Sequence, residues 1–164
     1  MTITLRPARP LDAGTLGAML TEAGKAHDWK PHLHTAAQDI AHVSKMIDRG
    51  WVTVACDGSG CVLGFIARDD DNVLALFVNA AARGQGVGRH LLNAAKRAAP
   101  RLTLWTFERN RAAQRFYERE GFVIAKRTDG SGNEERLPDV RYIWEKPAPA
   151  PAKGNPDQSK ETQP

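Results

Sequence analysis

Three glycines at every second position place the strongest constraint on the fold of this chain. Gly84, Gly86 and Gly88 stand between an apolar stretch at 72–78 and a segment at 86–99 that has the apolar spacing of a helix. Inside a helix each glycine costs about 1 kcal/mol relative to alanine, because its backbone has more freedom to lose. The pattern therefore predicts a strand followed by a helix, joined by a connection in which the backbone itself is needed.

The start of a helix after such a connection is suited to bind an anion. Its first N–H groups have no partners within the helix and lie at the positive end of the helix dipole. Glycines let this backbone close on a phosphate or pyrophosphate, and Arg83 and Arg89 add positive charge beside it. A tight turn that needs positive φ angles is the alternative interpretation, although one glycine would be enough for it.

The spacing of these residues narrows the class of anion site. A P-loop needs Lys-Ser or Lys-Thr after its last glycine, and neither pair follows here. The dinucleotide fingerprint does not fit either, because the third glycine comes one residue too early. The pattern that does fit is Arg-x-x-Gly-x-Gly, formed by Arg83, Gly86 and Gly88.

The chain up to residue 146 alternates between strand-like and helix-like patterns. Helices are expected at 10–24, 35–50, 86–99 and 110–121. Strands are expected at 2–8, 51–56, 61–68, 72–78, 101–107, 122–128 and 139–146. The order β-α-α-β-β-β-α-β-α-β-β predicts an α/β (α+β) fold, in which a mixed central sheet of about seven strands is flanked on both faces by about four helices.

Capping and apolar residues indicate how the helices begin, end and pack. The second helix opens with a threonine cap, Thr35, and ends in a glycine, Gly50. The first helix has four apolar residues at roughly helical spacing: Leu11, Leu16, Met19 and Leu20. The third helix carries Val87, Leu91, Leu92 and Ala95 on one face. These residues are therefore candidate core positions.

The composition indicates one globular domain followed by a tail. The 164 residues are 41% hydrophobic, which is enough for a single core. Residues 147–164 hold five of the ten prolines and almost nothing to bury. We therefore expect a folded domain at 1–146 and a Pro/Ala-rich flexible tail at 147–164. Cys56 and Cys61 flank an apparent hairpin turn and are expected to be reduced core residues, although they could also face each other across the two strands.

Charge and hydropathy limit the kinds of partner. A net charge of +4 and a pI near 9.3 favour anionic partners only mildly. No apolar run approaches the roughly 20 residues that span a bilayer, and the first residues do not have the pattern of a signal peptide. A cytoplasmic protein without a membrane partner is the resulting expectation.

A second motif follows the strand expected at 101–107. In RNRAAQRFYEREGFV, at 109–123, Asn110 and Tyr117 stand seven residues apart. Together with Arg-x-x-Gly-x-Gly and the opening stretch LRPARPLDA, this segment resembles the GCN5-related N-acetyltransferases, the GNAT family. The resemblance covers about residues 3–146. It implies the fold of that family and transfer of an acetyl group from acetyl-CoA to a primary amine of a small molecule or peptide, by direct attack in a ternary complex.

The resemblance also implies roles for individual residues. Main-chain N–H groups of the glycine segment would hold the pyrophosphate, and one near Phe77 or Val78 would act as oxyanion donor. Tyr117 is the expected general acid for the departing thiolate, and a buried core tyrosine is the alternative. Asn110 would both cap its helix and contact the cofactor. The expected cofactor-binding residues are Phe77, Val78, Arg83, Gly84, Gln85, Gly86, Val87, Gly88, Arg89 and Asn110, and no metal is implied.

The sequence does not assign a general base. An alkylammonium is only about one part in a thousand neutral at pH 7, so a group should take up its proton. Many members of the family use a glutamate on the fourth or fifth strand, but 72–78 has no carboxylate and Trp105 stands near the place where some members have one. His27, Asp28, His32 and His34, in the loop between the first two helices, could act through water, with an ordinary solvated loop as the alternative. Glu108 is expected to serve the helix N-terminus instead. Glu134, Glu135 and Asp139 could attract a cationic acceptor, with an exposed charged turn as the alternative. The loops at 25–34 and 130–139 are the expected acceptor pocket.

Two other functions stay open on the sequence alone. The missing carboxylate would suit a non-catalytic module that senses CoA or another nucleotide, in which Tyr117→Phe would have no effect. The basic pI would suit a nucleic-acid binder, but no basic-aromatic sheet motif or zinc ligand set supports one. Dimers are common in the family, so a homodimer is compatible with the resemblance. The sequence does not identify the acceptor.

Overall fold

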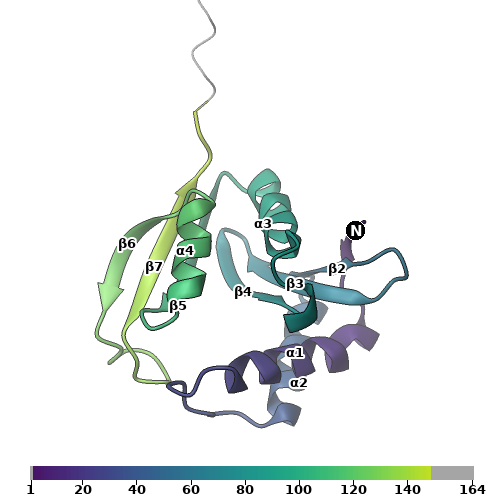
Figure 1. Ribbon diagram of the computed structural model, residues 1–164, viewed down its shortest axis with the longest axis horizontal. Coiled ribbons are helices and arrows are strands. Elements are labelled where there is room, and N and C mark those ends of the chain that lie inside the picture. The colour runs from purple at the N-terminus through teal and green to yellow at the C-terminus, as the bar shows by residue number, and fades with distance from the viewer. Residues whose placement is uncertain (1, 149–164) are drawn as a thin grey trace, which may run out of the picture.

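The computed structural model describes residues 2–148 and has the predicted order of elements (Figure 1). The strands are β1 (Thr4–Pro7), β2 (Val52–Cys56), β3 (Val62–Asp69), β4 (Asn72–Val78), β5 (Arg101–Phe107), β6 (Val123–Thr128) and β7 (Asp139–Glu145). The helices are α1 (Ala13–Lys25), α2 (Ala36–Asp48), α3 (Val87–Ala98) and α4 (Arg111–Arg119), with short 3-10 turns η1 (Pro10–Asp12) and η2 (Ala80–Ala82). The predicted α/β class and the alternation along the chain are confirmed.

The seven strands form one mixed sheet in the order β1-β2-β3-β4-β5-β7-β6. Every neighbouring pair is antiparallel except β4 and β5, which are parallel. Helices α1 and α2 cover one face of the sheet and α3 and α4 cover the other (Figure 1). Helices on both faces were predicted from the order of the elements.

Each face of the sheet carries its own core, because side chains alternate along a strand. On β2, Val54 packs with the α1 and α2 side, whereas Ala55 packs with the α3 side. The four residues predicted on one face of α3 are all buried: Val87, Leu91, Leu92 and Ala95. The predicted caps of α2 are also present, since Thr35 accepts from the N–H of Gln38 and Gly50 has a φ of 74°.

Strands β4 and β5 are joined at one end only. Asn72 and Thr103 are their single register pair, and the Thr103 N–H donates to the Asp71 carbonyl over 2.8 Å. The Thr103 hydroxyl also donates to Asn72 Oδ1 over 2.8 Å. Beyond this point the two strands diverge, so that the sheet opens between them toward their C-terminal ends (Figure 1). A parallel pair that separates in this way leaves backbone groups without a neighbouring strand.

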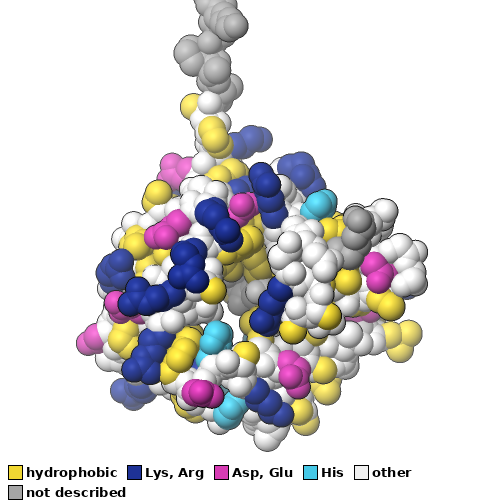
Figure 2. Space-filling model, viewed as in Figure 1, with side chains coloured by type: hydrophobic (Ala, Val, Ile, Leu, Met, Phe, Trp, Pro, Cys, Tyr) yellow, Lys and Arg dark blue, Asp and Glu magenta, His cyan; other side chains and the backbone are white. Residues whose placement is uncertain are grey.

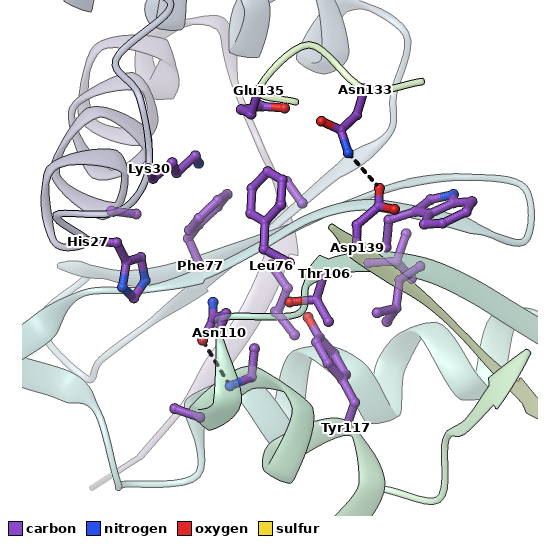
Figure 3. Close-up of a pocket in the computed structure, with 18 of the residues that line it drawn as sticks. His27, Lys30, Leu76, Phe77, Thr106, Asn110, Tyr117, Asn133, Glu135 and Asp139 are labelled. Atoms are coloured by element: carbon purple, nitrogen blue, oxygen red, sulfur yellow. Dashed lines mark hydrogen bonds between the residues drawn. The ribbon is translucent and has the colours of Figure 1, made fainter. Parts of the chain in front are cut away.

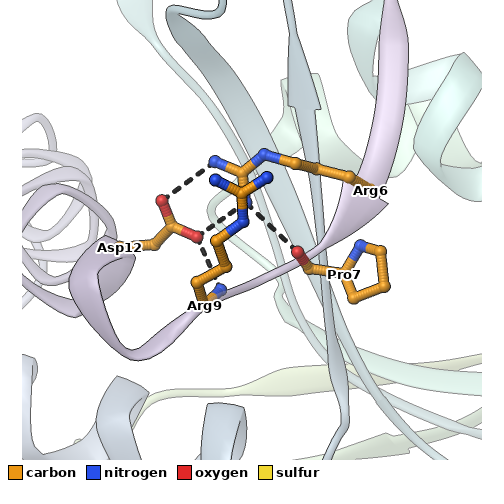
Figure 4. A network of polar contacts seen from close by, with 4 residues as sticks. All are labelled: Arg6, Pro7, Arg9 and Asp12. Carbon is orange, nitrogen blue, oxygen red and sulfur yellow. Dashed lines mark hydrogen bonds and ion pairs between the residues drawn. The ribbon is translucent and has the colours of Figure 1, made fainter.

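The first helix was expected from residue 10, with Leu11 in its apolar spacing, but the α-helix begins later and Leu11 lies outside it. Leu11 is 95% exposed, because Pro10–Asp12 forms a 3-10 turn and the α-helix begins only at Ala13. Asp12 fixes this turn: it accepts from both Arg6 Nη atoms over 2.8 and 3.0 Å and from the Arg9 N–H over 2.6 Å (Figure 4). The turn shifts the register of the apolar pattern, and Leu11 points away from the core.

Replacing Asp12 by asparagine is expected to lower the free energy of unfolding by about 1 kcal/mol at pH 7, because it removes a paired carboxylate. The hydrogen bonds from Arg6 hold the pKa of Asp12 below its ordinary value of 3.8. A depressed pKa stabilises the fold above that value, so the difference between wild type and variant should shrink as the pH falls below it. Urea unfolding at several pH values measures this. Asp48→Asn, at an exposed aspartate of α2, is the control and should show no such dependence.

The two cysteines are free thiols, but only one of them is a core residue. Cys56 is buried at the end of β2. Cys61 is exposed, which corrects the expectation that both lie in the core. The reason is that strand pairing begins at Cys56 and Val62, so Cys61 belongs to the turn, where its N–H donates to Asp57 Oδ1 over 3.0 Å.

The predicted boundary at residue 146 falls just after β7, which ends at Glu145. The expected tail lies outside the described residues from position 149 on. Within residues 2–148, no helix has the length and apolar character needed to cross a bilayer.

Candidate active site

Two of the three glycines adopt backbone angles that other residues avoid. Gly84 has a φ of 76° and Gly86 a φ of 85°. Gly86 is the N-cap of α3 and provides no side-chain hydrogen bond to the helix start. Gly88 has a different role, because a Cβ there would lie 3.3 Å from Phe116 Cζ on α4. The first two glycines therefore shape the turn, and the third lets α3 and α4 approach each other.

A cavity of about 580 Å³ lies at the start of α3. It is lined by six of the predicted cofactor-binding residues that surround the turn: Arg83, Gly84, Gly86, Val87, Gly88 and Arg89. Sequence reasoning missed Arg119 of α4, which also lines it. Arg89 Nε forms an ion pair with Glu120 Oε1 over 3.5 Å. Figure 2 shows Lys and Arg side chains on both sides of a hollow in the surface, so the charge and the uncapped helix start fit a pyrophosphate.

Gln85, a predicted cofactor-binding residue, does not lie with the others at the cavities. It is exposed, and its side-chain amide donates to the Ala81 carbonyl over 3.4 Å. It is not among the residues that line this cavity or the larger one described below.

The backbone of β4 presents alternate N–H groups to the opening between β4 and β5. The Asn79 N–H donates to the Leu63 carbonyl over 2.8 Å, in register with the pairs Phe65–Phe77 and Gly64–Val78. Because hydrogen bonds in an antiparallel ladder recur every second residue, the Phe77 N–H points to β3. By the same alternation, the N–H groups of Leu76 and Val78 point away from β3, toward the opening. Of the two amides considered from the sequence, that of Val78 therefore faces the opening.

A second cavity, of about 970 Å³, lies between α1, β4, β5, α4 and the β6–β7 loop. The predicted residues Phe77, Val78, Arg83, Asn110 and Tyr117 line it. It meets the smaller cavity at the residues that line both: Leu76, Val78, Arg83, Ala113 and Tyr117. The two predicted motifs are thus brought together where β4 separates from β5.

Tyr117 lies at this meeting point with its ring in an apolar environment. The ring centroids of Phe116, Phe122 and Tyr142 are 5.3, 5.6 and 6.1 Å away. Its hydroxyl points toward Thr106 of β5 (Figure 3). Burial raises the pKa of Tyr117 above its ordinary value of 10.0. The hydroxyl therefore stays protonated at neutral pH and can donate a proton. Tyr117 therefore packs in the core, as one interpretation of the sequence predicted, and it also lines both cavities; its role as general acid stays a prediction.

Asn110 caps α4, as its sequence context predicted. Its side-chain Oδ1 accepts from the Ala113 N–H over 3.1 Å, and its backbone N–H donates to the Phe107 carbonyl over 3.0 Å. These bonds hold the side chain at the edge of the larger cavity (Figure 3).

The loops expected to form an acceptor pocket do line the outer end of the larger cavity. The α1–α2 loop and the β6–β7 loop are joined by a hydrogen bond between His34 Nε2 and Glu134 Oε2, 3.1 Å apart. The ring of Trp29 stands edge-on to Phe107, with centroids 5.8 Å apart. Lys30 Nζ lies 5.5 Å from the centroid of the Phe107 ring. The structure therefore places an ammonium group against an aromatic ring in this cavity.

The structure separates the histidines and carboxylates that were considered from the sequence for the acceptor side of the reaction. His27, Glu135 and Asp139 line the larger cavity. The other five are not among its lining residues: Asp28, His32, His34, Glu108 and Glu134. Trp105 also lines it and is 50% exposed, so the position where some family members have a glutamate does face the cavity.

Comparison with known proteins agrees with this geometry. A family model described as an acetyltransferase (GNAT) domain matches residues 48–124, which include the opened β4 edge, the glycine turn and α4. The chain belongs to the GNAT family. It is thus an N-acetyltransferase, of a family that uses acetyl-CoA, and this favours the enzyme over the sensor module.

Two relatives of this GNAT protein match over most of their length. Peptidyl-lysine N-acetyltransferase YjaB of Salmonella typhimurium is 29% identical over 145 residues, which are 88% of this chain and 99% of that protein. The Escherichia coli protein of the same name is 29% identical over 147 residues, 87% and 99% of the two chains. The solution structure of apo-form YjaB from Escherichia coli has a TM-score of 0.71 at 25% identity and covers 90% of this chain and 100% of its own.

A further similar structure is that of yncA, a putative acetyltransferase from Salmonella typhimurium, with its cofactor acetyl-CoA. It has a TM-score of 0.69 at 20% identity and covers 94% of this chain and 99% of its own. This likeness concerns the fold alone.

Proposed function

We propose that this protein transfers the acetyl group of acetyl-CoA to the side-chain amine of a lysine in a peptide or protein, by direct attack within a ternary complex. The observation that carries the proposal is the meeting of the two cavities at Val78 and Tyr117. One cavity offers an anion site and the other an aromatic site for an amine. The two substrates would therefore reach the same strand edge from opposite ends.

The smaller cavity would hold the pyrophosphate of acetyl-CoA. The uncapped N–H groups at the start of α3 would bind it, with Arg83 and Arg119 nearby. The unpaired N–H groups of Leu76 and Val78 would bind the arm that leads to the thioester, as an added strand pairs with a free sheet edge. Asn110, at the N-cap of α4 after β5, would support the same arm from the other side of the opening.

The reaction needs stabilisation of negative charge at the thioester oxygen and a proton for the thiolate. The Val78 N–H, which faces the opening, would donate to that oxygen as charge develops on it. Tyr117 would give its proton to the thiolate when the C–S bond breaks. Its raised pKa keeps the phenol protonated until that step.

A lysine side chain fits the larger cavity in both shape and charge. The lining contains the rings of Trp29 and Phe107, against which an alkyl chain and an ammonium can pack. Glu135 adds a negative charge. The relatives with the printed name peptidyl-lysine N-acetyltransferase support lysine as the acceptor.

The proposal is tested with acetyl-CoA and two lysine peptides. One peptide has a free lysine side chain and a blocked N-terminus, and the other has a free N-terminus and a blocked lysine. Mass spectrometry should detect enzyme-dependent acetylation of the first only. Acetylation of the second only would mean that the acceptor is an α-amine, and binding of acetyl-CoA without transfer to either would support the sensor.

Lys30→Met is expected to lower the KM for the lysine peptide by about two- to fivefold, because the Lys30 ammonium occupies the Phe107 ring that the acceptor would use. The value of kcat should not change, since Lys30 is not placed at the strand edge. Steady-state kinetics at saturating acetyl-CoA measures both constants. Lys25→Met, at the exposed end of α1, is the control and should leave KM as in the wild type. An increase in KM for Lys30→Met would instead mean that Lys30 helps to bind the acceptor.

A further inference from the structure

The proposed reaction leaves one proton without an acceptor. A lysine is almost entirely an ammonium at neutral pH, and it can attack the thioester only after losing a proton. Strand β4 provides no carboxylate after Asn72, and Trp105 occupies the corresponding place on β5. The proton acceptor must come from another element that lines the larger cavity.

Hydrogen bonds and ion pairs rule against three of the carboxylates. Asp139 accepts from the Thr128 hydroxyl and, over 3.2 Å, from Asn133 Nδ2, so both of its oxygens hold the β6–β7 loop. Glu134 pairs with His34, and Glu108 pairs with Arg127 Nη1 over 3.8 Å outside the cavity. His27, which the sequence offered as a proton acceptor, and Glu135, which it placed near a cationic acceptor, line the cavity without such a bond among the described residues.

The position of His27 favours it over Glu135. His27 follows the end of α1, and Figure 3 shows it on the side of the cavity where Phe77, Asn110 and Tyr117 stand. Glu135 lies at the opposite end, beside Asn133 (Figure 3). The thioester would lie at the β4 edge, so His27 is the candidate on the reacting side.

The imidazole of His27 is also held in place by its neighbours. It stacks on the ring of Trp29, with centroids 4.8 Å apart and an interplanar angle of 27°. Trp29 in turn stands edge-on to Phe107, at the end of β5. The His27 carbonyl accepts from the Lys30 N–H over 3.2 Å, which closes the turn that carries the ring. A side chain supported in this way is oriented toward the cavity at little cost in entropy.

We propose that His27 is the general base that takes the proton of the acceptor ammonium. This rests on the proposed function. Neutral imidazole removes one proton from the ammonium, and the freed lone pair forms the N–C bond to the thioester carbon while the C–S bond breaks. The thiolate takes the proton of Tyr117, and the second proton lost by the amine restores the phenol. His27 passes its proton to water, so that each turnover releases one proton.

Other charged groups also face the same cavity and bear on its pH dependence. They are Lys30 from the α1–α2 loop, Arg83 beside β4, and Glu135 and Asp139 from the β6–β7 loop. The matched variant Glu135→Gln therefore belongs in the same experiment as His27→Gln.

The test measures kcat/KM for the side-chain lysine peptide against pH, together with the Kd for acetyl-CoA. For His27→Gln we expect a loss of about 10²-fold at pH 7 with an unchanged Kd. The loss should shrink as the pH rises, because the lysine then loses its proton to solvent. Free imidazole should restore part of the activity of His27→Ala. Glu135→Gln removes a charge from the acceptor cavity, so it should lower kcat/KM slightly and equally at every pH, without changing the shape of the pH profile. The loop control His32→Ala should keep the wild-type profile.

Two results would overturn the assignment while the proposed function stands. One is a constant loss for His27→Gln at every pH, without rescue by imidazole, which would indicate a structural role. The other is a wild-type profile for His27→Gln with the loss in Glu135→Gln, which would make Glu135 the base. If the wild-type protein acetylates no lysine peptide, the proposed function and this inference both fail.

Discussion

Gly86→Asp is expected to abolish measurable binding of acetyl-CoA in a calorimetric titration. Aspartate at a φ of 85° is strained, and its carboxylate would stand at the helix start that we propose for the pyrophosphate. Backbone strain and repulsion between like charges together should raise the Kd at least about 10²-fold. The expected loss thus tests the geometry and the charge of the site at once.

Two further glycine variants separate these causes. Gly86→Ala brings the strain without the charge and should weaken binding less than Gly86→Asp. Gly50→Asp has a similar φ of 74° in open space at the end of α2, away from both cavities, so it should bind acetyl-CoA like the wild type. Thermal unfolding of each variant shows whether it is folded. Wild-type affinity in a folded Gly86→Asp variant would mean that the anion binds elsewhere.

Tyr117→Phe is expected to lower kcat by about 10²-fold or more while the Kd for acetyl-CoA stays unchanged. The variant keeps the ring and its packing but loses the proton that we propose for the thiolate. The raised pKa of Tyr117 has a consequence for pH: an acid is active while protonated, so wild-type activity should persist into the alkaline range instead of falling near the ordinary value of 10.0.

Tyr142→Phe provides the matched control for this experiment. Tyr142 packs against the ring of Tyr117, but its hydroxyl donates to Glu118 Oε1 over 3.3 Å and is not among the groups that line either cavity. Its removal should leave kcat near the wild-type value. Equal rates for Tyr117→Phe and the wild type would show that another group, or water, protonates the thiolate.

Local patterns were sufficient to predict most of the fold. The burial of Val87, Leu91, Leu92 and Ala95 follows from the helical period alone, and the cap at Thr35 from its side chain. Leu11 fails because a 3-10 turn precedes α1, held by Asp12 through contacts with Arg6 and Arg9. A short 3-10 turn has no apolar period that distinguishes it from the first turn of an α-helix. The apolar spacing therefore placed the start of the first helix one turn too early.

The candidate site was predictable where one segment carries it, and not where separate segments meet. The glycine turn lies within a single stretch, and Arg119 could have been added from the helical spacing of three residues that separates it from Phe116, which packs on Gly88. In contrast, the approach of Trp29 to Phe107 and the pair of His34 with Glu134 join distant loops. No local period encodes such contacts, so the sequence did not assign the base.

The opening between β4 and β5 has a consequence for how the enzyme responds to its product. Backbone groups on a free strand edge would bind the arm of the cofactor, which the reaction leaves unchanged, and only a few contacts would involve the acetyl group. We therefore expect CoA to compete with acetyl-CoA at nearly equal affinity. The rate of transfer would then follow the ratio of acetyl-CoA to free CoA more closely than the concentration of acetyl-CoA alone. In this way the open strand edge would link lysine acetylation to the supply of acetyl groups.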